Sequence, residues 1–263
     1  MIYFLGGGNM ASAIIAGLVN GPHPVGVIDT NADKLKDLAA RYGVETFQQV
    51  PTLSAADVLV LAVKPQDLQA SCATIEPNGA LVVSIAAGVD LATLSQYLRG
   101  HQRLIRIMPN TPAQVGLGIS GVYAPAQVSV ADRDLAERIM AAVGEVVRLA
   151  DEDQIHAITS ISGSGPAYVF YLMNALAEAA AAQGFDADTA RQLSLATFKG
   201  AVALAEQSGE EFSLLQQKVT SKGGTTHEAI VTFTQKGVAE GIKAGVDACK
   251  QRSEAMQAAF KQG

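Results

Sequence analysis

The 263-residue sequence has few charges and no cluster of positive charge. Only 17% of its residues are charged, 49% are hydrophobic, and the formal net charge is −6. Because it has no Lys/Arg-rich run, we expect small molecules as partners and neither nucleic acid nor a membrane. No apolar stretch reaches the roughly 18 residues of a membrane-spanning helix, and no basic leader precedes the first apolar run, so a cytoplasmic protein is expected.

Cysteine and histidine are also scarce. Cys72 and Cys249 lie far apart and outside any zinc-binding spacing, which predicts buried free thiols in a reducing compartment. The four histidines fall in no triad or metal-binding spacing. No metal site is therefore predicted.

The first dozen residues carry a glycine motif between an apolar run and a helical pattern. Ile2 to Leu5 predicts a buried strand, and Gly6-x-Gly8-x-x-Ala11 follows it directly. In dinucleotide-binding folds the first glycine permits a tight turn, the second lets a pyrophosphate approach the backbone, and the small third residue packs the helix on the strand. The helix N-terminus attracts anions. We predict a nucleotide site here, the alternative being a glycine-rich turn in another α/β protein.

Strands and helices alternate as far as about residue 150. Strands are predicted over 2–5, 25–28, 57–63, 80–85, 103–107, 119–123 and 145–149, and helices over 32–42, 90–98 and 129–142, with another opening at Pro65. This order predicts a doubly wound, mainly parallel sheet that binds ligands at the carboxyl ends of its strands. The loops at 62–65, 86–88 and 108–112 lie there, although each could be a plain connection.

Beyond Asp151 the sequence predicts only helices. They cover 167–183, 187–207, 212–220 and 226 to the end, with Gly184 and Gly209 as stops. The predicted organisation is an α/β Rossmann domain over residues 1–155 and an all-α helical domain over residues 156–263. Small residues on long helices favour a helical dimer interface, with a monomeric bundle as the alternative.

Two glycine-rich stretches interrupt the helical half, at residues 161–168 and 219–226. Each places small hydroxyl residues and backbone N–H groups at the start of a predicted helix, which is anion-binding geometry. The alternative is a simple N-cap, which Ser164 and Thr225 would each serve.

Taken together, these motifs resemble the pyrroline-5-carboxylate reductase family, which catalyses the last step of proline biosynthesis. The resemblance rests on residues 6–11, 63–65, Arg106 with 108–112, 162–168 and 223–226, and the last two segments are the most specific. It implies an N-terminal Rossmann domain and a C-terminal helical domain through which subunits form dimers, and in some members decamers. In this family the helices of one subunit meet the cofactor domain of its partner at the active site.

The resemblance also implies roles for single residues. The cofactor would be held by Gly6, Gly8, Asn9, Met10, Ala62, Val63, Lys64, Pro65, Ala86, Ala87 and Asn110. The substrate carboxylate would lie against Ser164, Gly165, Gly223, Gly224 and Thr225. Thr226 matches the family position whose hydroxyl approaches the substrate nitrogen, and it is the candidate catalytic residue. Lys222 and His227 stand where the family usually has a proline and an aliphatic residue, and neither is assigned a role.

The choice between NADPH and NADH depends on the end of the second predicted strand. Asp29 is where an acid would hold the ribose hydroxyls of NADH, and it would repel the 2′-phosphate of NADPH. The family usually prefers NADPH, and Thr30 and Asn31 could hydrogen-bond that phosphate if Asp29 turns away. Either cofactor is therefore expected. The alternative for Asp29 is a helix N-cap or a loop carboxylate.

The lack of an evident general acid is consistent with reduction of an imine. A carbonyl needs such an acid, whereas a protonated cyclic imine is already electrophilic and mainly needs positioning. Two other functions stay open. A reductase of the β-hydroxyacid dehydrogenase type would need a lysine on the first helices after the sheet; residues 163–183 contain none, and Lys199 is the only one nearby. A non-catalytic NAD(P)-sensing protein would show degenerate loops in the helical half.

Overall fold

The computed structural model describes residues 1–261, and the chain divides into two compact units. The first unit comprises Met1–Ser164 together with the end of the chain from Ala248, and the second comprises Gly165–Asp247. The expected boundary at residue 155 falls inside helix α6 (Gln154–Ile158). The end of the chain joins the first unit because side chains from the last helix contact residues of the α/β half, such as Gln257 with Arg106.

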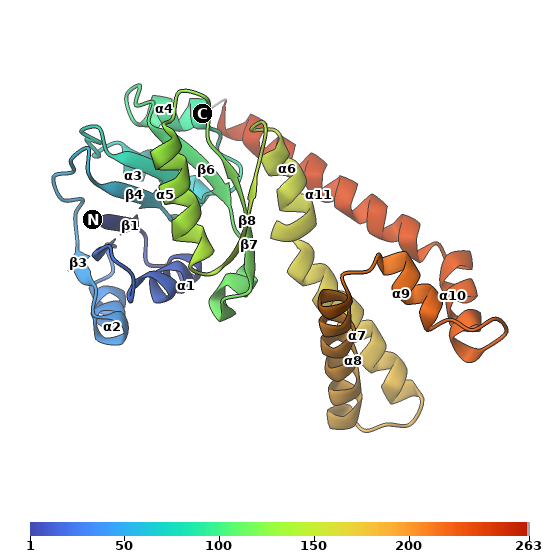
Figure 1. Ribbon diagram of the computed structural model, residues 1–263. Helices are drawn as coiled ribbons and strands as arrows, with labels where there is room; N and C mark the ends of the chain where they lie inside the picture. The colour runs from blue at the N-terminus through green and yellow to red at the C-terminus, as the bar shows by residue number, and fades with distance from the viewer. Residues whose placement is uncertain (262–263) are drawn as a thin grey trace. The chain divides into compact units, whose positions relative to one another are not determined.

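The first unit is organised by an eight-stranded sheet with strand order β3-β2-β1-β4-β5-β6-β7-β8 (Figure 1). All neighbouring strands are parallel except β6 and β7. The predicted doubly wound Rossmann sheet is confirmed. The strands are β1 (Ile2–Leu5), β2 (Val25–Ile28), β3 (Glu45–Phe47), β4 (Val58–Leu61), β5 (Leu81–Ser84), β6 (Leu104–Met108), β7 (Gly118–Tyr123) and β8 (Gly144–Arg148).

Strand β3 was not predicted from the sequence. It is three residues long and lies at the edge of the sheet, where Glu45 and Thr46 are exposed. An edge strand of this kind has no buried apolar run, and so it lacks the pattern by which the other strands are recognised.

Helices cover both faces of the sheet, and each face has its own core. Alternate residues of one strand enter different cores: Val58 and Val60 belong to one, and Leu59 and Leu61 to the other. The first core includes residues of α1 (Asn9–Leu18), α2 (Ala32–Tyr42) and α5 (Val130–Ala141). The second includes residues of α3 (Leu68–Cys72) and α4 (Leu91–Tyr97). Because the strands are buried from both sides, their carboxyl ends are where a ligand has access.

The second unit is helical. It contains α7 (Gly165–Ala182), α8 (Ala187–Ser208), α9 (Phe212–Lys218), α10 (Thr225–Gln235) and the first part of α11 (Val238–Phe260), and α7 packs along α8 (Figure 1). The prediction of one helix from Thr226 to the end is wrong. Gly237, at φ +67°, separates α10 from α11, because this left-handed conformation ends a helix and is easily adopted by glycine.

Large apolar side chains of the second unit remain exposed on the isolated chain. The exposed fraction is 79% for Phe212, 76% for Tyr171 and 66% for Phe170. Only Ala190 and Ser194 of this unit are buried. An apolar surface of this extent is typical of a region that another protein surface covers. None of the helices within residues 1–261 has both the length and the apolarity to cross a membrane.

Candidate functional site

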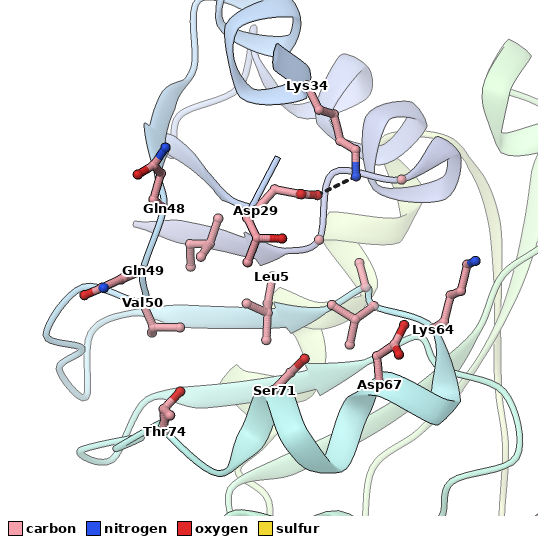
Figure 2. Close-up of a pocket in the computed structure, with 16 residues that line it drawn as sticks. Leu5, Asp29, Lys34, Gln48, Gln49, Val50, Lys64, Asp67, Ser71 and Thr74 are labelled. Carbon is pink, nitrogen blue, oxygen red and sulfur yellow. Dashed lines mark hydrogen bonds and ion pairs between the residues drawn. The ribbon is translucent and has the colours of Figure 1, made fainter. Parts of the chain in front are cut away.

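A cleft of about 720 Å³ opens at the carboxyl ends of β1, β2 and β4 (Figure 2). The chain runs from β1 outward to β3 and then returns to add β4 on the other side of β1, so this is the point at which the winding of the sheet reverses. Such a switch point is where doubly wound sheets bind their ligands. The predicted cofactor residues that line the cleft are Gly6, Gly8, Asp29, Thr30, Ala62, Val63 and Lys64.

The glycine motif shapes one wall of the cleft. Gly6 has φ +99°, and a Cβ there would lie 2.9 Å from the carbonyl oxygen of Ala62, so only glycine allows β1 and β4 to end this close together. A Cβ on Gly8 would meet no atom within 4 Å. Gly8 is the N-cap of α1 and uses no side chain for this purpose. Free N–H groups and open space therefore coincide at this helix N-terminus, and both suit a pyrophosphate.

Asp29 lies at the end of β2 and its carboxylate is enclosed by donors. Its Oδ2 accepts from the backbone N–H of Gly7 at 2.9 Å and from Nζ of Lys34 at 2.7 Å, and its Oδ1 accepts from the N–H of Asn31 at 3.0 Å. Burial alone would raise the pKa of Asp29, but these hydrogen bonds outweigh it and hold the pKa below its ordinary value. The carboxylate is charged at neutral pH.

The suggestion that Asp29 is a helix N-cap is wrong, because Asn31 has that position. Its Oδ1 accepts from the N–H of Lys34 at the start of α2. The carbonyl end of the Asn31 side chain is thus already used inside the protein.

The opposite wall of the cleft consists of residues that sequence reasoning did not identify. Figure 2 shows Asp67, Ser71 and Thr74 on the side away from Asp29 and Lys34, with Gln48 and Gln49 at one end. Gln48 and Gln49 directly follow β3. Because that strand was not predicted, the sequence did not indicate that these residues lie at the end of a strand. Nothing in the sequence distinguishes Ser71 and Thr74 from other surface polar residues.

The remaining cofactor candidates do not line this cleft. Asn9 and Met10 open α1, and Pro65 opens the 3-10 turn η1 (Pro65–Asp67). Ala86 and Ala87 follow β5, and the loop they belong to is close to the end of α11, since a Cβ on Gly88 would lie 3.4 Å from Met256 and Phe260. Asn9 and Met10 come directly after the lining residue Gly8, and Pro65 comes directly after Lys64, whereas Ala86 is buried in the second core.

Asn110 holds two loops together. It precedes the 3-10 helix η2 (Thr111–Val115), and its Nδ2 donates to the carbonyl oxygen of Ser162 at 3.1 Å. Its Oδ1 accepts from the N–H of Ile119 at 2.9 Å. Both ends of its amide are used inside the protein. Asn110 would therefore contribute to a nicotinamide site by fixing the conformation of its loop and not through its own amide.

Arg106, on β6, is a fully buried charge. Its Nη1 donates to Glu152 at 2.9 Å and to Gln257 of α11 at 2.8 Å, whereas its Nε and Nη2 have no partner among the described residues. Glu152 also accepts from the N–H of Leu91. The guanidinium thus joins the sheet, α4 and the end of α11 in one network.

Ser164, predicted to bind substrate, lies between the π-helical turn η3 (Thr159–Gly163) and α7. Its Oγ is 3.2 Å from Sγ of Cys249, on α11. Cys249 is only half-buried, so the prediction of two buried thiols is wrong for it, because the prediction rested on spacing and not on packing. Cys72 is buried, and burial raises the pKa of its thiol to about 12.

The second glycine-rich stretch forms the start of α10. Gly223 has φ +72°, and Gly224 is the N-cap of the helix, without a side-chain cap. Thr225 is therefore not the cap. Thr225 and Thr226 are exposed, and their hydroxyls make no hydrogen bond within residues 1–261. Donors of the first helical turn and two free hydroxyls are thus available to an anion.

Two protein families match separate stretches of this chain. A family described as pyrroline-5-carboxylate reductase dimerisation matches residues 152–256. A family described as NADP oxidoreductase, coenzyme F420-dependent, matches residues 1–88. The second match covers the strands and loops that form the cleft.

Curated relatives and solved structures agree with the family matches over nearly the whole chain. A pyrroline-5-carboxylate reductase of Pseudomonas aeruginosa is 40% identical and covers 96% of this chain and 95% of its own. The structure of a pyrroline-5-carboxylate reductase from Coxiella burnetii superposes with a TM-score of 0.87 at 38% identity, covering 97% of both chains. A Plasmodium falciparum pyrroline carboxylate reductase with NADP bound has a TM-score of 0.82 at 25% identity, covering 97% of this chain and 99% of its own.

Proposed function

The chain belongs to the pyrroline-5-carboxylate reductase family, and we propose that it reduces 1-pyrroline-5-carboxylate to L-proline with NADPH or NADH. The observation that carries this proposal is likeness to such reductases over nearly the full length. The stretches matched by the two families, residues 1–88 and 152–256, contain the lining of the cofactor cleft and both glycine-rich loops of the helical half. No observation favours the β-hydroxyacid dehydrogenase type, and a sensing protein would have no need of intact substrate loops.

The reaction adds a hydride to the imine carbon of the ring, which is the carbon double-bonded to nitrogen, and a proton to the ring nitrogen. A reduced nicotinamide supplies the hydride, and a protonated imine accepts it without a strong general acid. The protein's main task is to orient the ring and its carboxylate, and positioning of this kind is worth up to roughly 7–11 kcal/mol.

We infer that the cofactor lies along the strand ends of the first unit. Gly6, Gly8, Asn9 and Met10 receive the pyrophosphate at the start of α1. Asp29, Thr30 and Asn31 lie at the adenosine ribose, and residues 62–65 lie along the adenosine. Ala86, Ala87 and the loop fixed by Asn110 lie at the nicotinamide. The open space at Gly8 and the donors of the first turn of α1 support the pyrophosphate assignment.

We also assign the substrate carboxylate to two loops, around Ser164–Gly165 and around Gly223–Thr225. Thr226 is proposed to contact the imine nitrogen through its hydroxyl, which has no competing partner in the described chain. Thr226→Val is expected to lower kcat by about 100-fold with unchanged cofactor affinity. Thr232→Val, on the same helix, is the matched control, since the Thr232 hydroxyl only donates to the carbonyl oxygen of Glu228. Equal turnover by the two variants would remove Thr226 from the mechanism.

Self-association belongs to the same proposal. The matched family is described by its dimerisation, and the exposed apolar side chains of the helical unit form a surface suited to a second copy. We propose a dimer whose helical unit completes the substrate site of its partner, and further assembly of dimers into a decamer. Light scattering on the purified protein distinguishes the monomer, the dimer and the decamer.

The activity test is oxidation of NADPH and of NADH, followed optically with 1-pyrroline-5-carboxylate, with an oxo acid as control. Turnover with the imine and none with the oxo acid is expected. Turnover with the oxo acid alone would instead favour a hydroxyacid dehydrogenase. Cofactor binding without turnover on either substrate would favour a sensing protein.

A further inference from the structure

An ion pair lies at the end of the cofactor cleft, at the acid that the sequence places beside the adenosine ribose. Nζ of Lys34 lies 2.7 Å from Oδ2 of Asp29, as the dashed line in Figure 2 shows. The Asp29 side chain is 10% exposed and the Lys34 side chain is 40% exposed. The carboxylate is therefore enclosed, while the ammonium still faces the cleft and water.

The hydrogen-bonding capacity of this pair is only partly used. The carboxylate of Asp29 accepts two hydrogen bonds at Oδ2 and one at Oδ1, so one further lone-pair direction remains at Oδ1. The ammonium of Lys34 has three N–H donors, and its one hydrogen bond among the described side chains is to Asp29. The pair can thus accept one hydroxyl and donate to one anion.

The charge of the pair changes what the cleft tolerates. An unpaired aspartate at the end of β2 would repel the 2′-phosphate of NADPH, whereas a carboxylate paired with a lysine carries almost no net charge. Lys34 also lies on the first turn of α2, with its ammonium directed into the cleft lining. Charge-assisted hydrogen bonds from lysine to phosphate are among the stronger ones in proteins.

We propose that Lys34 is the residue that lets this cleft accept the 2′-phosphate of NADPH, and that Asp29 competes with that phosphate for the lysine. This inference rests on the proposed cofactor site. With NADH, one ribose hydroxyl donates to the free lone pair on Oδ1 of Asp29, while the pair with Lys34 stays intact. With NADPH, the ammonium of Lys34 donates to the phosphate. The two residues together give the protein its use of both cofactors.

The test is calorimetric titration of the purified protein with NADPH and with NADH, independently of turnover. Lys34→Gln is expected to raise the Kd for NADPH by about tenfold and to change the Kd for NADH by less than about twofold. Asp29→Asn is expected to lower the Kd for NADPH and raise that for NADH. Lys36→Gln is the matched control, because Lys36 is an exposed lysine of the same helix, and it should change neither Kd.

A double variant separates direct contact from neutralisation of Asp29. In the Asp29→Asn background, Lys34→Gln should still weaken the binding of NADPH. Without the charge of Asp29, the 2′-phosphate is the counter-charge of the lysine. If that effect disappears, or if Lys34→Gln weakens both cofactors equally, the inference is wrong. If the original protein binds neither dinucleotide, the inference and the proposed function both fail. If it binds both but does not reduce the imine, only the proposed function fails.

Discussion

A substitution at Gly8 should weaken cofactor binding while leaving the fold intact. A Cβ at this position meets no atom within 4 Å, and its φ of −74° is accessible to any residue. Gly8 is also the N-cap of α1, where a carboxylate is more favourable than glycine by a few tenths of a kcal/mol. The free energy of unfolding of Gly8→Asp is therefore expected to stay within about 1 kcal/mol of the original.

The effect on binding should be much larger, because the new carboxylate would stand where the pyrophosphate is expected. Two like charges about 4 Å apart repel by about 1 kcal/mol in water and about 4 kcal/mol at an effective dielectric constant near 20. With 1.4 kcal/mol for each factor of ten, the Kd of NADPH and of NADH should rise by about 5- to 700-fold.

Calorimetric titration and urea unfolding measure the two effects separately. Gly17→Ala is the opposite case, since its Cβ would lie 2.5 Å from the carbonyl oxygen of Ala142, and it should lower the urea midpoint. If Gly8→Asp binds either cofactor as tightly as the original protein, the pyrophosphate lies elsewhere. A lowered urea midpoint for Gly8→Asp would show that the space at Gly8 is not open.

Three further predictions concern stability and assembly. Glu152→Ala leaves the buried guanidinium of Arg106 without its counter-charge and should lower the free energy of unfolding by about 3 kcal/mol, measured with urea. The hydrogen bond from Arg103 lowers the pKa of Asp132. The stabilisation that this pair gives the folded state is therefore present above about pH 4 and is lost as the pH falls through the folded-state pKa of Asp132. Asp132→Asn should flatten the acid limb of a plot of urea midpoint against pH, and an unchanged slope would contradict this. Phe212→Asp should reduce the mass measured by light scattering, because it places a charge on an exposed apolar surface; an unchanged mass would exclude Phe212 from the interface.

Much of the first unit could be predicted from local pattern. The buried strand β4 reads as a continuous apolar run, and the glycine motif at residues 6–11 follows β1 directly. A strand buried on both faces needs such a run, and a tight turn beside a pyrophosphate needs glycine, so both requirements are met within a few residues of sequence. Local pattern also predicted that Asp29 follows the second strand and that a helix begins after the glycines at 223 and 224.

Contacts between distant residues decided the rest. The enclosure of Asp29 by Gly7 and Lys34, the use of Asn110 to join two loops, and the contact of Ser164 with Cys249 leave no periodic or compositional signal. Each depends on where separate elements end in space. For this reason Lys34 and the polar wall formed by Ser71 and Thr74 were missed, although the cleft that they line was predicted.

Apart from the edge strand β3 and the break between α10 and α11, the sequence by itself determined the order of strands and helices, the cofactor motif and the glycine loops, because these depend on residues adjacent in the chain. Only the tertiary structure decided that Asp29 is paired with Lys34 and that the end of α11 returns to the first unit through Gln257 and Arg106. Charge pairing and burial depend on packing between residues far apart in the chain, and so neither can be read from local sequence.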